Sequence, residues 1–312
     1  MQKANRVIFA IFAISFTLAI ILLVALFGSQ PSPQSSFHLK PDEKTILFAI
    51  TPWGDEKKVR EAYKPLISYL EDHLQKKIQF LIMEDYNVLN DNIAEGNIDL
   101  TVISPLSYIY AIRKEPNLKY VVTTLKEENG KINDHYNGFI VALKSKYPGW
   151  TFDDFIKTPK KYSLGFVSKT SASGYAYPYA MMKKMGLDPY QTFKSVTFYE
   201  SHSSLVKALN EGKVDLATIG DNMMFEAEKT YGKIYTIAYI SDPIPASPWI
   251  ASKNVDDATV NKLRQILTNI DKNNDLKTLL LKNAQDKGYK VFGSGFYDGI
   301  KEVVQYVEDS NK

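Results

Sequence analysis

The chain has 312 residues, 45% of them hydrophobic and 23% charged, which is an ordinary globular composition with room for two domains of about 100–200 residues each. Cysteine is absent, so the chain forms no disulfide, thiolate nucleophile or cysteine-ligated metal centre. Its 38 basic and 35 acidic residues nearly balance, so the composition does not indicate binding to nucleic acid.

The first clear pattern is a hydrophobic run near the N-terminus. Lys3 and Arg6 precede 21 uncharged residues, Val7 to Phe27. A helix of that length, at about 1.5 Å per residue, spans a bilayer, whereas the apolar core of a cleavable signal is about 7–15 residues long. We therefore expect a membrane anchor at residues 1–28, with the rest of the chain outside the cytoplasm. Cleavage of this segment as a long signal peptide is the alternative. Residues 29–43 have the composition of a linker.

From about Lys44 onward, short β-branched or aromatic runs alternate with helical patterns, which predicts an α/β fold. The expected strands are Thr45 to Thr51, Ile78 to Met83, Asp99 to Ile103, Tyr120 to Leu125, Phe139 to Leu143, Tyr162 to Val167, Ser195 to Tyr199, Leu216 to Ile219 and Tyr235 to Ile240. The expected helices are Val59 to Leu74, about Gly174 to Met185, about Ser203 to Asn210, Ala258 to Ile270, Leu276 to Asp286 and Tyr297 to Val307. In the first helix, Pro65 is expected to be tolerated only near the first turn.

Residues 84–104 and 200–220 form an internal repeat, which aligns without a gap at an offset of 116 positions. Each copy is expected to contain a helix that ends at a glycine, followed by a strand that is entered through an aspartate. Two copies predict two similar α/β lobes, with a ligand in the crevice at the carboxyl ends of their strands. The alternative explanation of the match is that such residues are common wherever a helix is followed by a strand.

Several polar residues are expected to face this crevice. Tyr86 and His202 occupy equivalent positions of the repeat, just before its helix, although a purely local role at the helix start is the alternative for His202. Ser171, Ser173 and Gly174 lie between an expected strand and an expected helix, where unpaired N–H groups bind anions. An ordinary serine cap is the alternative there. Asp221 follows a strand end and is either a crevice residue or an exposed loop residue.

Other motifs indicate little chemistry. Residues 293–295 lack the spacing and context of a dinucleotide fingerprint, and Ser204 with Lys207 lacks the companion motif of acyl-transfer enzymes. The 4 histidines are scattered, so no metal site and no cofactor are predicted. An acyl-transfer enzyme using Ser173 or Ser204 would need a paired general base, and no spacing indicates one. These motifs therefore do not indicate an enzyme.

A set of short motifs, in this order and spacing, resembles the phosphonate-binding family of ABC-transporter substrate-binding proteins, which includes phosphate and phosphite binders. The motifs are Glu84-Asp85-Tyr86, Asp99-Leu100 leading to Ser104-Pro105-Leu106-Ser107-Tyr108, Ser171-Ala172-Ser173-Gly174 with Pro178, His202, Val214-Asp215 with Asp221, and Ile244-Pro245-Ala246-Ser247-Pro248. The resemblance implies an α/β, two-lobed type II periplasmic-binding fold with a hinged ligand cleft. Lobe 1 would comprise residues 44–142 and 247–312, and lobe 2 residues 143–246, with hinge crossings near Ala142 and Ser247.

Carried over by position, the resemblance implies ligand contacts from Tyr86, Ser104, Ser171, Ala172, Ser173, His202 and Asp221. The implied ligand is a small phosphorus oxyanion (phosphate, phosphite or an alkylphosphonate), and the implied partner is an ABC permease. A sensor that signals to a membrane partner is the alternative. Relatives that bind aminophosphonates carry an acid where this chain has Ser247 and an aromatic residue where it has Ile103. Aminoethylphosphonate is therefore expected to bind less tightly than phosphate, phosphite or methylphosphonate.

Overall fold

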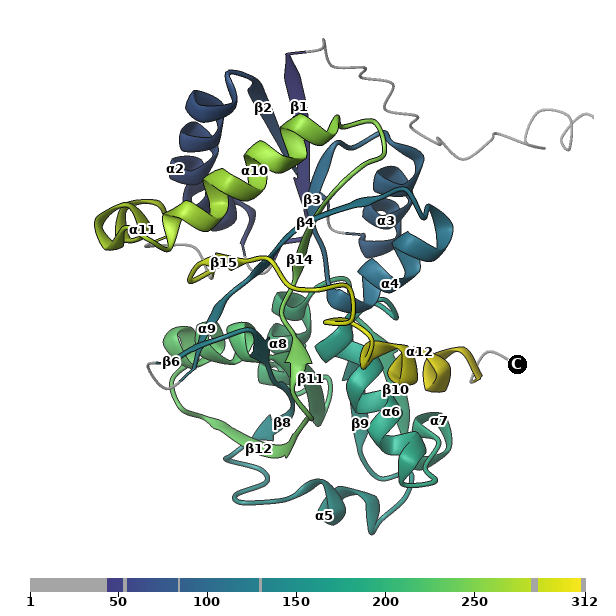
Figure 1. The fold of residues 1–312 in the computed structure, drawn as a ribbon. Coiled ribbons are helices and arrows are strands. Elements are labelled where there is room, and N and C mark those ends of the chain that lie inside the picture. The colour runs from purple at the N-terminus through teal and green to yellow at the C-terminus, as the bar shows by residue number, and fades with distance from the viewer. Residues whose placement is uncertain (1–43, 53–54, 84, 129–130, 282–285, 310–312) are drawn as a thin grey trace, which may run out of the picture. The chain divides into compact units, whose positions relative to one another are not determined.

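The computed structural model describes residues 44–52, 55–83, 85–128, 131–281 and 286–309. The expected membrane anchor (1–28) and linker (29–43) lie outside these residues. Within the described ranges, no helix combines the length and the apolar character needed to cross a bilayer. The described chain forms two large mixed β-sheets, each covered by helices, and two small two-stranded sheets, which confirms the predicted α/β class (Figure 1).

The first sheet has six strands in the order β15-β4-β14-β3-β1-β2, and with its helices we call it lobe 1. Its strands are β1 (Thr45–Ile50), β2 (Lys77–Ile82), β3 (Leu100–Val102), β4 (Lys119–Thr124), β14 (Pro248–Ala251) and β15 (Tyr289–Lys290). β1 pairs in parallel with β2 and β3, whereas β14 and β15 pair antiparallel with their neighbours. Helices α2 (Glu56–Leu74), α10 (Asp257–Ile270) and α11 (Asn274–Leu281) cover one face, and α3 (Tyr86–Glu95) and α4 (Pro105–Lys114) cover the other.

Strand β1 is buried on both faces of this sheet. Phe48 packs on Trp249 with 4.9 Å between ring centroids, in the core beneath α2 and α10. Its neighbour Ala49 points to the opposite face and joins Leu89 and Ile250 in the core beneath α3. Because both faces are covered, the strand is a continuous hydrophobic run, which is why it could be predicted from the sequence.

Helix α2 continues through Pro65, contrary to the expectation that this proline would lie near a helix start. The helix begins at Glu56, after Asp55, whose side chain accepts a hydrogen bond from the Lys58 N–H. A proline inside a helix removes one backbone donor and is usually disruptive. Here Tyr63 and Leu66, on either side of it, are buried in the core of lobe 1, and this packing keeps the helix continuous.

The second sheet has five strands in the order β10-β9-β11-β8-β12, and with its helices we call it lobe 2. The strands are β8 (Gly138–Leu143), β9 (Ser163–Phe166), β10 (Ser195–Phe198), β11 (Leu216–Gly220) and β12 (Tyr235–Ile240), with α7 (Pro189–Thr192) before β10. One face packs against α5 (Phe152–Ile156), the π-helical turn η1 (Ala172–Ala176), its direct continuation α6 (Tyr177–Lys184) and α12 (Ile300–Asp309). The other face packs against α8 (His202–Asn210) and α9 (Asp221–Tyr231).

The chain passes from lobe 1 to lobe 2 between β4 and β8 and returns between β12 and β14. The first crossing contains the hairpin β5 (Lys126–Glu128) and β6 (Lys131–Asn133), then β7 (His135–Tyr136), which pairs with β13 (Ile244–Pro245) of the return crossing. The first crossing was expected near Ala142. That residue instead lies inside β8, which pairs with β11 and β12 in lobe 2. The return crossing reaches lobe 1 at β14, directly after Ser247.

Helix α12 contacts both lobes, although the sequence assigned it to lobe 1 alone. Ile300 and Val304 are fully buried in the core of lobe 2. At its exposed side, Glu308 pairs with Arg113 of α4 at 2.6 Å, and Glu302 pairs with Lys184 of α6 at 2.9 Å. The C-terminal helix therefore links α4 of lobe 1 to α6 of lobe 2, beside which it lies in Figure 1.

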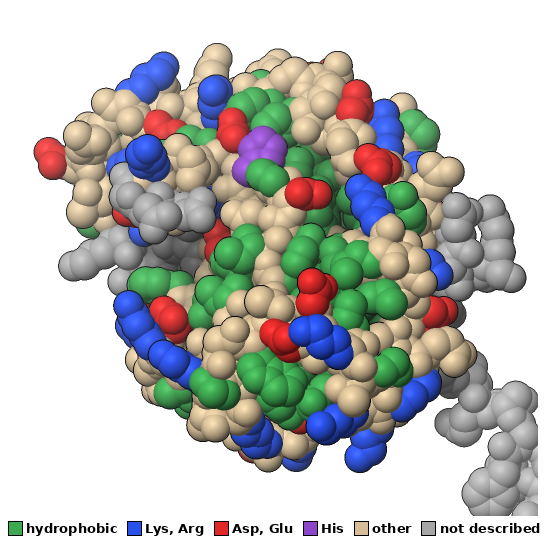
Figure 2. Space-filling model, turned by 90° about the horizontal axis from the view of Figure 1, so that it is seen from below, with side chains coloured by type: hydrophobic (Ala, Val, Ile, Leu, Met, Phe, Trp, Pro, Cys, Tyr) green, Lys and Arg blue, Asp and Glu red, His purple; other side chains and the backbone are tan. Residues whose placement is uncertain are grey.

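The surface mixes charges of both signs. Figure 2 shows Lys and Arg side chains next to Asp and Glu on one face, with hydrophobic side chains between them. This arrangement agrees with the near balance of 38 basic and 35 acidic residues.

Candidate functional site

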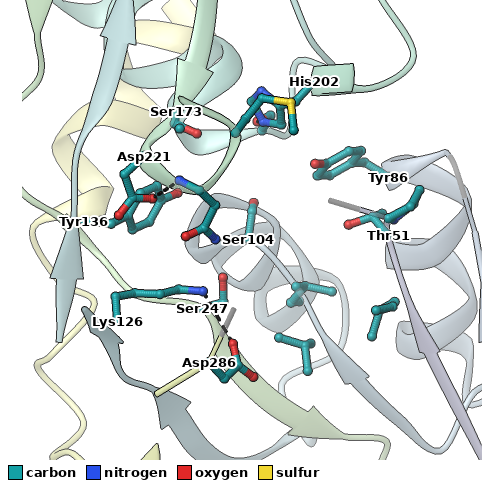
Figure 3. A pocket seen from close by; sticks show the side chains of 18 of the residues that line it. Thr51, Tyr86, Ser104, Lys126, Tyr136, Ser173, His202, Asp221, Ser247 and Asp286 are labelled. Atoms are coloured by element: carbon teal, nitrogen blue, oxygen red, sulfur yellow. Dashed lines mark hydrogen bonds and ion pairs between the residues drawn. The ribbon is translucent and has the colours of Figure 1, made fainter. Parts of the chain in front are cut away.

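A pocket of about 130 Å³ lies between the two lobes (Figure 3). It lies where β1, β3 and β11 end, which is the crevice position at which open α/β sheets bind ligands. The polar and charged side chains in its lining are Thr51, Tyr63, Tyr86, Ser104, Lys126, Tyr136, Ser171, Ser173, His202, Asp221, Asn222, Ser247 and Asp286.

The internal repeat positions two of these side chains. Tyr86 is the first residue of α3 and His202 is the first residue of α8, so the two copies place them at equivalent points of the two lobes. Both helices are followed by a glycine in the left-handed region, Gly96 with φ +83° and Gly212 with φ +71°. The predicted repeat is therefore confirmed as a structural repeat.

The aspartates of the repeat have matching structural roles. Asp99 Oδ2 accepts a hydrogen bond from the Leu47 N–H at 2.9 Å, and Asp215 Oδ2 accepts one from the Ser163 N–H at 2.9 Å. In each lobe this bond ties the start of a central strand to its neighbour. The two lobes thus present their helix starts to the pocket in the same way.

Several helices begin at the pocket. Besides Tyr86 and His202, the first turns of α4, α9 and the η1-α6 helix contribute Ser104, Asp221 and Ser173. The first N–H groups of a helix have no partner within that helix, and its N-terminus carries a partial positive charge. Helix starts from both lobes therefore make the pocket favourable for an anion.

The loop that opens η1 lies tightly against the sheet of lobe 2. Ser171 Oγ accepts a hydrogen bond from the Gly174 N–H at 3.1 Å, and Ser173 lies over the paired glycines Gly138 and Gly220. A Cβ on Gly138 would lie 3.2 Å from Ser173 Cβ, and one on Gly220 would lie 2.9 Å from Ser173 Oγ. A larger residue at either position would therefore require Ser173 to shift.

Ala172 is the one predicted contact that does not line the pocket. Its side chain is 1% exposed and belongs to the core of lobe 2. Only its backbone could contact a ligand. The other six predicted residues all lie in the pocket lining, and their contact with a ligand stays a prediction.

Hydroxyl groups near the η1 loop act on two tyrosines in the lining. Thr51 and Ser171 act to lower the pKa of Tyr86, and Ser173 acts to lower the pKa of Tyr136, but burial has the larger effect. Burial raises the pKa of both tyrosines, and for Tyr136 the Asp221 carboxylate adds to the rise. Both hydroxyls therefore keep their protons and can act as neutral hydrogen-bond donors.

Ser104 links the two lobes directly. Its Oγ donates a hydrogen bond to the Thr170 carbonyl at 2.7 Å and accepts one from the Ser107 N–H at 3.0 Å. The Ser107 hydroxyl reaches the same carbonyl at 3.2 Å. The Ser104 hydroxyl therefore already donates its proton to lobe 2. It would have to rotate and break this hydrogen bond before it could donate to a ligand.

Asp221 introduces a carboxylate at the start of α9. Its Oδ1 accepts a hydrogen bond from the Asn222 N–H at 2.6 Å, and its own N–H donates to the Asn137 carbonyl at 3.1 Å. Figure 3 shows the carboxylate beside Tyr136, on the same side of the pocket as Ser173. A carboxylate can only accept hydrogen bonds, so it favours a ligand that brings its own proton.

His202 is neutral in this pocket. Its Nε2 lies 3.5 Å from Ser171 Oγ. Burial lowers the pKa of His202 to about 4, although the backbone of Thr218 opposes this effect. The imidazole can therefore donate one hydrogen bond at neutral pH, and a bound anion would favour its protonation.

We expect His202 to make the stability of the ligand-free protein depend on pH. Between pH 6.5 and about 4 the unfolded chain protonates this imidazole while the folded protein does not. The stabilisation is therefore complete above pH 6.5 and is lost as the pH falls towards 4, with a decrease of about 3 kcal/mol in the free energy of unfolding. Urea unfolding at several pH values measures it. A His202→Gln variant with the same pH dependence would contradict the assignment.

The pocket also contains residues that the sequence analysis missed, above all Lys126 and Asp286. Lys126 Nζ lies 3.4 Å from Asp286 Oδ1, and both side chains are buried. Asp286 was expected at the end of a helix, but α11 ends at Leu281 and Asp286 precedes β15. Thr51 and Tyr136 were missed as well. Thr51 directly follows β1, so the rule that ligands bind at strand ends could have found it.

The described residues include no group of three or more His, Asp or Glu side chains that could hold a metal ion. The site is instead rich in neutral donors, namely serine, threonine and tyrosine hydroxyls, an imidazole and the N–H groups of helix starts. Such a site can bind a small oxyanion by hydrogen bonds from several directions.

Comparisons with known proteins agree with this chemistry. The family described as "ABC transporter, phosphonate, periplasmic substrate-binding protein" matches residues 48–293. The phosphate-import protein PhnD of Mycolicibacterium smegmatis is 25% identical over 292 residues, which cover 89% of this chain and 83% of that protein. The phosphonates-binding periplasmic protein of Escherichia coli is 21% identical over 251 residues, with coverage of 79% and 72%.

Solved structures show the same fold. A binding protein component of an ABC phosphonate transporter from Pseudomonas aeruginosa superposes with a TM-score of 0.77 at 19% identity, covering 86% of this chain and 88% of that one. PhnD1 from Prochlorococcus marinus, solved in complex with methylphosphonate, gives a TM-score of 0.73 at 17% identity, with coverage of 85% and 98%.

Proposed function

Because the chain belongs to the family of periplasmic substrate-binding proteins of phosphonate ABC transporters, we propose that it binds a small phosphorus oxyanion in the pocket between its lobes and delivers it to an ABC permease. The convergence of helix starts and neutral hydroxyl donors from both lobes carries this proposal. A family match over residues 48–293 supports transport over signalling to a membrane partner. This family is a class of transport proteins rather than of enzymes.

The proposed ligand is phosphate, phosphite or an alkylphosphonate. Tyr86, Ser171, Ser173, His202 and the backbone N–H of Ala172 would donate hydrogen bonds to its oxygens, with Ser104 closing the pocket from lobe 1. Asp221 would accept the proton that such an anion still carries at neutral pH. The lobes would open and close about the crossings that contain β7 and β13.

Thermal unfolding of the purified protein tests this function. A ligand that binds only the folded form raises the midpoint of unfolding, by an amount that increases with the logarithm of its concentration divided by its dissociation constant. We expect phosphate, phosphite or methylphosphonate to raise the midpoint and sulfate to leave it unchanged. If none of the phosphorus oxyanions raises it, the proposed ligand class is wrong.

We also propose that the apolar run from Val7 to Phe27 anchors the protein to the outer face of the cytoplasmic membrane. This role agrees with the extracytoplasmic location of the family. We expect the protein to stay in the membrane fraction after a high-salt wash and to keep its N-terminal residues. A soluble form that begins near Gly28 or Ser29, found by N-terminal sequencing, would indicate a cleaved signal peptide instead.

A further inference from the structure

A buried ion pair forms the pocket wall next to Ser247. Lys126 Nζ lies 3.4 Å from Asp286 Oδ1, and the two side chains are 9% and 6% exposed. Figure 3 shows the pair beside Ser247, on the opposite side of the pocket from Ser173 and His202. Of the described residues that line the pocket, Lys126 alone is a lysine or arginine. The pair therefore sets the charge at the end of the pocket that is remote from the proposed oxyanion loop.

Backbone pairing holds this pair in place. The Leu125 N–H donates to the Gly288 carbonyl, and the Lys287 N–H donates to the Leu125 carbonyl, both at 2.8 Å. These bonds extend the ladder between β4 and β15, so they fix the backbone beside both charged residues. The Thr124 N–H also donates to the Ser247 carbonyl at 3.0 Å, which joins Ser247 to the same wall. Backbone hydrogen bonds thus join the segments that carry Lys126, Asp286 and Ser247.

Among the described residues, the cation that compensates the charge of Asp286 is Lys126. The carboxylate also accepts a hydrogen bond from the Tyr289 hydroxyl at 3.3 Å, but that partner is neutral. Removing one member of a buried ion pair leaves the other as an uncompensated charge in a poorly solvated position. Without Lys126, a positively charged group on the ligand could supply the missing compensation.

We propose that Lys126 is a specificity-determining residue that occupies Asp286 and thereby excludes phosphorus oxyanions whose substituent is cationic, while admitting those with an uncharged substituent. An ammonium group beside Asp286 would have to lie against the Lys126 ammonium in a buried site, and such like-charge contact is strongly unfavourable. This inference rests on the proposed function and on an oxyanion held at the Ser171–Ser173 loop.

Asp221, the other carboxylate of the pocket, is not placed to interact with a cationic substituent of the ligand. Asp221 follows Gly220, where a Cβ would lie 2.9 Å from Ser173 Oγ, so Asp221 lies at the oxyanion end. A substituent that points away from that end approaches Ser247 and the ion pair instead. The charge of the substituent therefore interacts mainly with Lys126 and Asp286.

The test compares two ligands of equal size, aminoethylphosphonate and propylphosphonate, which differ by an ammonium group in place of a methyl group. Isothermal titration with the full-length protein in detergent should give a propylphosphonate affinity at least about tenfold higher. In Lys126→Met this preference should reverse, because the ligand ammonium then compensates Asp286. In the double variant Lys126→Met/Asp286→Asn the reversal should disappear.

Lys126→Gln provides a second variant in case Lys126→Met does not fold, because its amide keeps a hydrogen bond to Asp286 without the charge. A wild type that prefers aminoethylphosphonate, or folded variants with an unchanged preference, would overturn the proposal. Equal weakening of both ligands in the variants would also overturn it, since Lys126 would then contact the oxyanion itself. If the wild type binds no phosphorus oxyanion at all, the proposed function fails instead.

Discussion

At neutral pH the protein is expected to bind phosphate or methylphosphonate at least about 100-fold more tightly than sulfate, because two buried negative charges that face each other without a proton cost about 3 kcal/mol or more. Asp221 presents a carboxylate to the pocket, and its Oδ1 already accepts a hydrogen bond from the Asn222 N–H. A monoprotonated phosphorus oxyanion can donate its proton to this carboxylate. Sulfate is fully ionised and cannot.

Asp221→Asn should raise sulfate affinity at least about tenfold, because an amide can donate a hydrogen bond where the carboxylate could only accept one. Competition titrations with the wild type and the variant measure the change. Asp153→Asn is the control, since it removes the same charge from an exposed residue outside the pocket lining and outside both crossings. Tight sulfate binding by the wild type would show that Asp221 does not act as a proton acceptor for the ligand.

The second large effect is expected from Gly174→Ala, which should weaken oxyanion binding at least about 100-fold. A Cβ on Gly174 would lie 2.8 Å from Ser171 Oγ, 2.8 Å from Val167 Cβ and 2.9 Å from His202 Cε1. The new methyl group must therefore displace Ser171 and His202, two of the proposed ligand contacts. Isothermal titration gives the loss of affinity.

A second glycine-to-alanine substitution, away from the pocket, shows whether the loss of affinity is specific to Gly174. Gly293 has no atom within 4 Å of an added Cβ and is not in the left-handed region, so Gly293→Ala should bind like the wild type. Circular dichroism and thermal unfolding establish that Gly174→Ala is folded, although the contact with Val167 should lower its stability by about 1–3 kcal/mol. Unchanged affinity in a folded Gly174→Ala protein would mean that the anion is held elsewhere.

The parts of the site that could be predicted are those fixed by local sequence. Tyr86 and His202 were found because each begins a helix within a repeated segment, and the start of a helix is determined by nearby residues. The Ser171 to Gly174 loop was found for the same reason, since small hydroxyl residues before a helix indicate exposed N–H groups.

Other parts depend on contacts between distant segments. Lys126 and Asp286 meet because β15 pairs with β4, and nothing in either segment indicates that pairing. The strand β14 was missed for a similar reason, because its four residues are buried between β3 and β4 only in the folded protein. Helix α4 was missed although Ser104 and Pro105 form a favourable start, with serine as the cap and proline in the first turn.

The position of α12 also bears on how fast a bound ligand leaves. This helix contributes Ile300 and Val304 to an apolar cluster that includes Leu106 of α4, so the edge of the molecule at α12 cannot separate without exposing apolar surface. Opening about the crossings that contain β7 and β13 would therefore have to disrupt these apolar contacts. The exposed pair between Arg113 and Glu308 contributes at most about 1 kcal/mol and weakens in salt. Residence time should therefore depend on the apolar contacts of α12 far more than on ionic strength, which stopped-flow release at low and high salt can measure.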